Sequence, residues 1–299
     1  MSDTQGEVDL LAYAREELQL HLGQLGMRLD AELTVDATMA PASFSVVATG
    51  DRAVRLRGCD ASAVLSAVYT LLETAGWRFE ITGPVPPLTP DAAAIAMVDI
   101  AQQPVVTRRG VRQHLNFPMD ISSYAVEEAL DYVRNLARLR FNHIAFHSYP
   151  GQWIAGPQGG KDLPAGSFFY GIRHDLPDHP LLQRSIRNDR TYCIPDIEPY
   201  MDDKAACSER AMAWLRQVIQ ECKRVGLHVQ FSFEPRDGGD DVTPALATCR
   251  RVLELYPEID ALEMITNEAG SGEPCERSAV DDVLARLFPN VDHDAGELE

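Results

Sequence analysis

Residues 228–234 read His-Val-Gln-Phe-Ser-Phe-Glu, and this short stretch carries the pattern on which the fold prediction depends. Successive side chains of a β-strand point to opposite faces of the sheet. The three apolar side chains would therefore share one face, while Gln230, Ser232 and Glu234 share the other. A strand covered by helices on both faces of an open parallel sheet should be apolar on both faces. The polar face of this strand needs another explanation.

The same alternation recurs in two further strand candidates, residues 109–116 and 143–148. The polar face carries Arg112 and His114 in the first of them and His147 in the second. In a β/α barrel, inward-facing side chains reach a ligand site at the C-terminal mouth, which explains a repeatedly polar face better than an open sheet does. An open sheet with one face in water is the alternative.

Strand and helix patterns alternate from residue 105 onward, which predicts βα units and a parallel sheet. After the strand at 109–116, the predicted order is helix 125–140, strand 143–148, a long irregular segment 149–203, helix 209–225, strand 228–234, helix 243–256, strand 261–266 and helix 279–287. This gives about four βα units, whereas a closed barrel of this type has eight.

The N-terminal region has a different organisation. Apolar residues at helical spacing predict helices at 10–25 and 61–75, and short strands are predicted at 31–35, 44–49, 53–58 and 77–81. A proline-rich break at 83–90 and the stretch 91–104 have the character of a linker with a docking strand. We therefore expect an α/β protein with a small α/β domain over 1–100. A β/α (TIM-type) barrel over 101–299 follows, apparently truncated after about four βα units.

Composition excludes several classes of partner. The chain has 299 residues and a formal net charge of −18, which disfavours nucleic acid and anionic membrane surfaces. The longest apolar run, at 92–98, is too short to cross a bilayer. The polar, acidic start at 1–8 does not have the pattern of a secretory signal, so a cytoplasmic location is expected. The six cysteines form no CxxC pair, which favours free thiols.

Polar side chains gather where the barrel strands are predicted to end, which is where β/α barrels place their active sites. Carboxylates, amides, histidine and arginine are the groups that hydrogen-bond sugar hydroxyls. The site candidates are Arg112 and His114 on the first strand, His147 and Tyr149 at the end of the second, Glu234, Arg236 and Asp237 at the end of the third, and Asn267 and Glu268 at the end of the fourth.

Two of these residues are candidate catalytic carboxyls. Glycoside hydrolysis commonly uses two carboxyl groups, of which one is a proton donor with a raised pKa. Glu268 follows an apolar strand and precedes a glycine-containing loop, and Glu234 leaves the preceding strand at the same rim. The alternatives are an ordinary loop glutamate at 268 and an internal ion pair of Glu234 with Arg236.

A metal site is a less favoured hypothesis for the same region. His114, His143 and His147 would have to converge with Glu234, although they come from different strands and no HExxH-type spacing exists. No GxGxxG turn opens a helix, so a nucleotide has no support either. We predict neither a metal nor a cofactor.

Several segments resemble known enzymes. The stretches YAREELQ at 13–19, VRLRGCD at 54–60, AVYTLLE at 67–73 and GWRF at 76–79 resemble the small α/β domain that precedes the barrel in glycoside hydrolases of the hexosaminidase and α-glucuronidase types. The stretch RRGVR at 108–112 resembles their first barrel strand. The stretch TNEAG at 266–270 resembles the Asn-Glu pair that ends strand four in many retaining glycosidases. The resemblance implies that Glu268 is the acid/base and that Asn267 bonds a sugar 2-hydroxyl.

The sequence departs from these families in two respects. It lacks the Asp-Glu pair of hexosaminidases that use the substrate's acetamido group, and it lacks the later strand that supplies the nucleophile in the Asn-Glu families. We therefore expect a glycoside hydrolase, or the N-terminal portion of one, acting on a uronic-acid or amino-sugar glycoside. This chain alone would lack full activity, and it would either self-associate through exposed barrel edges or be marginally stable. The alternatives are a non-catalytic carbohydrate-binding protein and a metal-dependent barrel enzyme.

Overall fold

The computed structural model describes residues 4–115, 121, 124–148, 196–200, 203–233 and 243–264. The chain forms two compact units, and neither is continuous in sequence. The first contains Met1–Val111, Leu130–His143 and Glu221–His228, and the second contains Arg112–Ala129, Ile144–Gln220 and Val229–Glu299. These units are defined by compactness in space, and the division of the chain into domains 1–100 and 101–299 stays a prediction.

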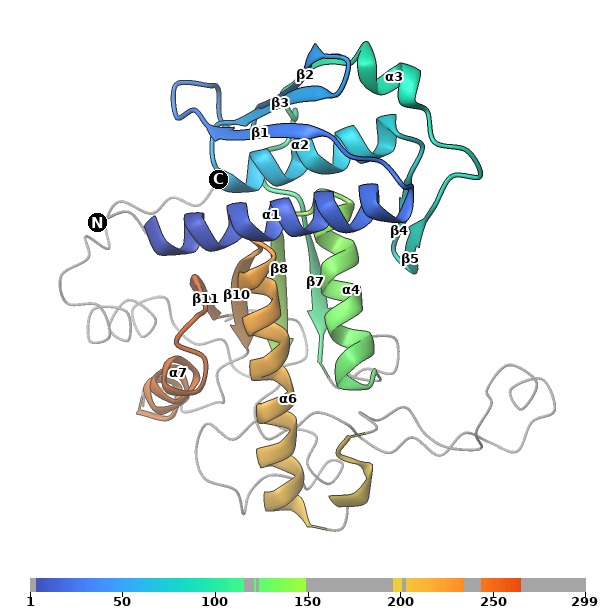
Figure 1. Cartoon of the computed structure of the whole chain (residues 1–299). Coiled ribbons are helices and arrows are strands. Elements are labelled where there is room, and N and C mark those ends of the chain that lie inside the picture. Colours follow the sequence, from blue (N-terminus) through green and yellow to red (C-terminus); the bar gives the residue numbers. More distant parts are fainter. Residues whose placement is uncertain are drawn as a thin grey trace. The chain divides into compact units, whose positions relative to one another are not determined.

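The first unit is built on a four-stranded sheet with the order β1-β3-β2-β6. Strand β3 pairs in parallel with β1 and antiparallel with β2, which also pairs antiparallel with β6. Helices α1 and α2 lie on the same side of this sheet (Figure 1). The elements are α1 (Thr4–Gln24), β1 (Asp30–Val35), β2 (Phe44–Gly50), β3 (Ala53–Gly58), α2 (Ala61–Thr74) and β6 (Asp99–Gln102). The docking strand predicted within 91–104 is thus present as β6.

Helix α2 forms the centre of the first unit's core. The carboxylate of Asp60 caps its N-terminus by accepting a hydrogen bond of 2.7 Å from the backbone N–H of Ala63. Almost every residue from Ala61 to Leu72 is buried, as expected of a helix that is apolar nearly all round. After the helix, Gly76 adopts a φ of 105°, a conformation that glycine tolerates best.

The segment after α2 differs from its prediction. Instead of a simple break at 83–90, β4 (Arg78–Glu80) pairs antiparallel with β5 (Gly83–Val85). The positive φ of Gly83 allows the tight turn between them. Pro84 can be accommodated because a two-stranded sheet consists only of edge strands, where a missing N–H is tolerated. A short helix, α3 (Ala92–Ala96), then leads into β6.

A buried ion pair joins α1 to α4 (Val126–Arg138) within the first unit. Nε and Nη2 of Arg138 each donate a hydrogen bond of 3.0 Å to a different carboxylate oxygen of Glu17. The hydroxyl of Tyr69 on α2 donates to the same carboxylate at 3.1 Å. Residues Glu17 and Arg138 are only 5% and 9% exposed. The Glu17 carboxylate therefore joins three helices, α1 to α4 by a bidentate charge pair and α1 to α2 by the Tyr69 hydrogen bond.

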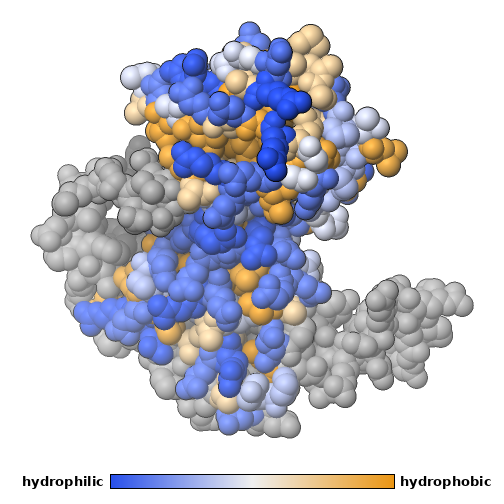
Figure 2. Space-filling model, in the orientation of Figure 1, coloured by the Kyte–Doolittle hydropathy of each residue, from blue (hydrophilic) through white to orange (hydrophobic). Residues whose placement is uncertain are grey.

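A groove of about 510 Å³ lies on the first unit between α1 and β1. Its floor includes the buried side chains of Leu18, Leu22 and Leu33, and its rim includes Arg15 and Arg28. Figure 2 shows the corresponding apolar surface, bordered by hydrophilic residues. The groove thus combines buried leucines with exposed charged residues of both signs, Arg15, Arg28 and Asp30.

Replacing Gly58 with alanine should destabilise the protein by about 1–3 kcal/mol, the usual cost of overpacking. A Cβ at position 58 would lie 2.6 Å from the backbone carbon of Ala63 and still closer to the backbone nitrogen of Val64, and helix backbone cannot yield easily. Chemical denaturation measures the change. The control is Gly23→Ala, because a Cβ at that position meets nothing within 4 Å. Equal stability of the two variants would contradict the close packing of α2 on β3.

The second sheet has the order β11-β10-β8-β7, so the described strands that follow one another along the chain are neighbours. Each connection contains a helix, and β10 and β11 are parallel. This confirms the predicted parallel α/β arrangement. The elements are β7 (Gly110–His114), α4, β8 (His143–Ser148), η2 (Glu198–Tyr200), α6 (Lys204–Arg224), β10 (His228–Phe233), α7 (Thr243–Leu255) and β11 (Ala261–Met264).

The apolar faces of these strands are buried as the alternation predicts. Val229, Phe231 and Phe233 of β10 are fully buried, and Phe231 stacks on Tyr256 with ring centroids 5.7 Å apart. None of the helices in the described ranges combines the length and the apolar character needed to span a membrane. The predicted helix at 279–287 lies outside the described residues.

Candidate functional site

The polar face of the second sheet is spanned by one ion pair. Nη2 of Arg112 on β7 lies 2.5 Å from Oε2 of Glu263 on β11. These are the two outer strands of the four, and neighbouring strands lie about 4.8 Å apart, so a flat sheet would hold them about 14 Å apart. The two side chains meet over the polar face of the sheet. Their contact links polar residues of the two outer strands, β7 and β11.

Residues of β10 complete the contacts of Glu263. Ser232 and Glu263 are register partners in the parallel β10–β11 pair, so their side chains share a face. Burial by itself raises the pKa of the Glu263 carboxyl, but hydrogen bonds from Ser232 and Gln230 and the charge of Arg112 outweigh it. The net pKa lies below the usual value, which means that Glu263 is held as a carboxylate.

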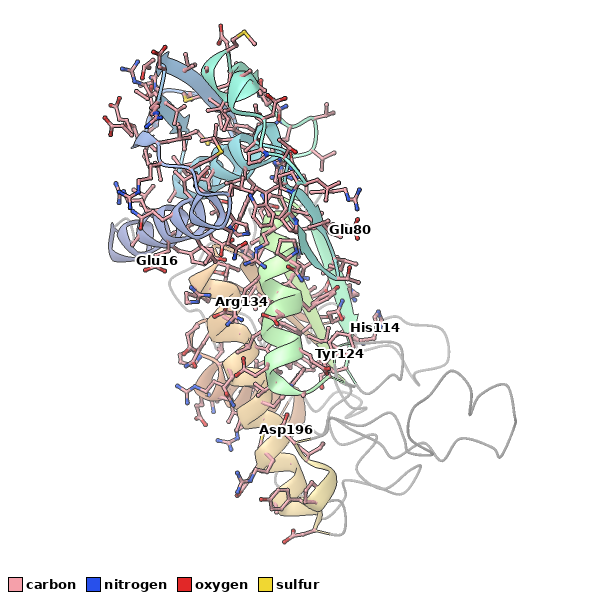
Figure 3. The ribbon with its side chains drawn as sticks, turned by 45° about the vertical axis from the view of Figure 1, so that its right-hand side comes forward. Glu16, Glu80, His114, Tyr124, Arg134 and Asp196 are labelled. Carbon is pink, nitrogen blue, oxygen red and sulfur yellow. The ribbon has the colours of Figure 1, made fainter. Side chains whose placement is uncertain are left out.

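Two histidines extend this group toward β7 and β8. His147 is fully buried, and its Nδ1 lies 2.9 Å from Oγ of Ser232. The ring of His114 lies 5.0 Å from that of His147, tilted by 58°. His114 is at the C-terminal end of β7 (Figure 3). A continuous set of polar side chains therefore runs from β7 across β8 and β10 to β11. We call it the polar-face cluster: Arg112, His114, His147, Gln230, Ser232 and Glu263.

The structure brings together three of the predicted site residues, namely Arg112, His114 and His147. Their contact with a substrate stays a prediction. The remaining candidates lie outside the described residues: Tyr149, Glu234, Arg236, Asp237, Asn267 and Glu268.

Sequence reasoning overlooked Glu263 as a site residue. The signal was present, because Glu263 lies between Leu262 and Met264 inside an otherwise apolar strand. A charged residue in such a position requires a partner. Alternation places it on the same face as Ala261, which is the face that carries Ser232 on β10.

The metal hypothesis is not favoured by the positions of its histidines. His143 begins β8, whereas His147 is close to its end, and four residues along a strand span about 13 Å. His143 instead stacks on His228, with centroids 5.3 Å apart. Among the residues that the structure describes, no three His, Cys, Asp or Glu side chains are grouped as a metal site requires.

The Arg112–Glu263 pair should make stability depend on pH. Because the folded pKa of Glu263 is lowered from 4.5, its carboxylate stabilises the folded state above that pH, and the contribution is lost as the pH falls through the folded pKa. As the pH is lowered from about 5.5 to about 3.5, the free energy of unfolding should therefore fall less in Arg112→Met than in wild type. Urea unfolding at both values measures this difference. Arg78→Met, which breaks an exposed pair with Glu80, is the control. An unchanged pH dependence in Arg112→Met would contradict the assignment.

The fold, a small α/β unit with a sheet of successive βα units, is similar to that of solved glycoside hydrolases. No protein-family model and no curated protein matches the sequence. Among solved structures, a GH138 enzyme targeting pectin rhamnogalacturonan II matches with a TM-score of 0.54 at 13% identity, over 95% of this chain and 33% of that chain. CpGH89 from Clostridium perfringens, in complex with its substrate GlcNAc-alpha-1,4-galactose, matches with a TM-score of 0.53 at 11% identity, over 93% and 36%. The chain thus spans about a third of the length of these enzymes.

Proposed function

We propose that the protein is a glycoside hydrolase, or the N-terminal portion of one, that cleaves O-glycosidic bonds by carboxylate acid/base catalysis. The observation that carries this proposal is the polar-face cluster, which lies on one face of the βα sheet in a glycoside-hydrolase-like fold. Hydroxyl-rich ligands are recognised by such sets of directed donors and acceptors. Two solved enzymes of similar fold act on pectin rhamnogalacturonan II and on GlcNAc-alpha-1,4-galactose.

The proposal includes a β/α barrel of which β7, β8, β10 and β11 are the first four strands. The Arg112–Glu263 contact favours a sheet that curves toward its polar face, because a flat sheet would separate the two strands by about three strand spacings. In this arrangement the polar-face cluster lies inside the barrel. The uncovered edges, β7 and β11 among the described strands, would also be the surfaces of self-association.

Within this scheme Glu268 is the proton donor and Glu234 is the second carboxyl. Glu234 follows β10 with the same parity as Ser232, whose side chain shares a face with that of Glu263 on β11. Glu268 follows β11 itself. Asn267, Tyr149, Arg236 and Asp237 would contact the sugar from the same rim, together with Arg112, His114 and His147. No metal or cofactor enters this mechanism, since acid/base hydrolysis needs only the two carboxyl groups.

The proposal is tested with the longest natural form of the protein and a panel of aryl glycosides and oligosaccharides that carry uronic acids or N-acetylhexosamines. Hydrolysis of one member, with release of reducing sugar, supports it. Saturable binding measured by calorimetry, without hydrolysis, would instead establish the non-catalytic carbohydrate-binding function. Absence of both binding and hydrolysis across the panel would contradict the carbohydrate-directed function.

A further inference from the structure

The outer edge of β1 exposes backbone groups with which no described strand pairs, because β1 is the first strand in the order of its sheet. Along a strand of a parallel pair, successive residues direct their backbone N–H and C=O alternately to one side and to the other. The N–H groups of Asp30 and Asp36 each donate at 2.8 Å to a carbonyl oxygen at an end of β3. The backbone groups of Ala31, Leu33 and Val35 therefore point away from β3, toward the open edge.

The same edge borders the groove between α1 and β1. Ala31 and Leu33 line this groove together with Leu18 and Leu22 of α1, and the three leucines are 9% exposed or less. An extended peptide combines backbone groups that pair with a strand edge and side chains that fill pockets at every second residue. It is therefore the class of ligand that uses both features of this surface, whereas an acyl chain would leave the edge of β1 unpaired.

The charged residues of the groove favour an acidic ligand. Arg15 and Arg28 are exposed, and neither forms an ion pair or a side-chain hydrogen bond with another described residue. Asp30 also lines the groove, but strand alternation turns its carboxylate to the face of the sheet opposite Leu33. Two arginines without a carboxylate partner among the described residues are thus available to an acidic peptide, on a chain whose formal net charge is −18.

The positions of the two arginines set the length of the ligand. Arg15 precedes Gly23, another residue of the groove, by about two turns of α1, which is about 12 Å along the helix axis. Arg28 follows soon after the end of the same helix. An extended chain advances about 3.3 Å per residue, so about four residues span the groove between the arginines.

We propose that the groove between α1 and β1 binds an extended segment of another polypeptide, which adds as a strand to the edge of β1. Its apolar side chains lie on the leucines of the groove, and an acidic group at each end pairs with Arg15 or Arg28. All the residues involved belong to the first unit. The interaction therefore does not depend on the polar-face cluster or on the glycosidase function.

Fluorescence polarisation with the full 299-residue chain tests this interaction. The probes are fluorescein-labelled hexapeptides with glutamate at each end and valine, leucine, isoleucine or threonine at the four inner positions. At least one probe should bind saturably, and its counterpart with lysine at each end should bind about tenfold more weakly. Absence of binding by every probe, or equal binding of the lysine counterpart, would overturn the proposal.

N-methylation of the probe distinguishes strand addition from simple apolar contact. A methyl group on an amide nitrogen removes the hydrogen that a neighbouring strand would accept. Because alternate amides of a strand face the same neighbour, methylation should abolish binding at every second inner position and should be tolerated at the positions between them. Equal tolerance at all inner positions would show that the backbone of β1 takes no part, and it would rule out strand addition.

Gly23→Leu blocks the groove without disturbing the core, since a Cβ at position 23 meets nothing within 4 Å. This variant should lose binding at least tenfold, whereas Gly23→Ala should retain most of it, and circular dichroism verifies that both are folded. Full binding by a folded Gly23→Leu protein would place the peptide elsewhere. Self-association that Gly23→Leu abolishes would identify a second copy of the chain as the occupant, and it would also overturn the proposal.

The arginines are tested by a double variant, Arg15→Gln with Arg28→Gln. It should weaken binding of the acidic probe about tenfold and leave binding of the lysine counterpart no weaker than before. Arg108→Gln is the control, because Arg108 is an exposed arginine that does not line the groove. An equal loss in Arg108→Gln, or no loss in the double variant, would contradict the role of Arg15 and Arg28.

Discussion

Glu268→Gln should lower turnover of glycosides with poor leaving groups by about 10²–10⁴-fold, the scale expected when one general acid/base is lost. Glutamine keeps the shape of the side chain but cannot transfer a proton to the departing oxygen. Aryl glycosides with activated leaving groups need less protonation and should be affected much less. Steady-state rates on a matched pair of natural and activated substrates, measured with the longest natural form of the protein, test this expectation.

The control for this variant is Glu263→Gln, which changes a glutamate within the strand that precedes Glu268. Glu263 contacts Arg112, so its replacement should alter both substrate classes alike, without the dependence on leaving group. Unchanged turnover of natural glycosides by Glu268→Gln would remove Glu268 from catalysis. Glu234 would then be the next carboxyl to replace.

Arg138→Met should lower the free energy of unfolding by about 3–5 kcal/mol, because it leaves a buried carboxylate without its charge partner. Among the described residues, Glu17 would keep the hydrogen bond from the Tyr69 hydroxyl and its more distant contact with His21. Methionine retains much of the volume of the arginine stem, so loss of packing contributes little. Urea or guanidinium unfolding, followed by circular dichroism, measures the change.

Two further variants isolate the cause of that loss. Adding Glu17→Gln to Arg138→Met removes the stranded charge and should restore part of the stability, so the two changes should not be additive. Arg55→Met breaks a pair with Glu32 whose side chains are 48% and 61% exposed, and it should have little effect. If Arg138→Met lowered the free energy of unfolding no more than Arg55→Met does, the Glu17–Arg138 pair would not be an important source of stability in the first unit.

Much of the secondary structure could be predicted because it follows from local spacing. The strand at 143–148 and the helix at 61–75 have the bounds His143–Ser148 and Ala61–Thr74 in the structure. The periodicity of apolar residues is set by the element itself and needs no knowledge of distant partners. The hairpin of β4 and β5 was missed because glycine and proline in 83–85 are ordinary signs of a chain break.

The candidate site was predictable only in part. Strand alternation placed Arg112, His114 and His147 on one face, and the structure agrees. Glu263 was missed because its importance depends on Arg112, which is 151 residues away in the sequence. No local pattern reveals such a partner, since contacts of this kind are created by the order of strands in the sheet.

The tie between Glu17 and Arg138 also has a consequence for how the protein is made. The two residues are 121 positions apart, and the first unit further requires the segment Glu221–His228. At a synthesis rate of about 5–20 residues per second, the ribosome delivers that last segment about 10–40 s after Glu17. During the first part of that interval Glu17 has no arginine partner, because Arg138 has not yet been synthesised. During the rest of it the first unit still lacks the segment Glu221–His228. A nascent chain of this kind depends on chaperones for longer than a domain whose residues are contiguous.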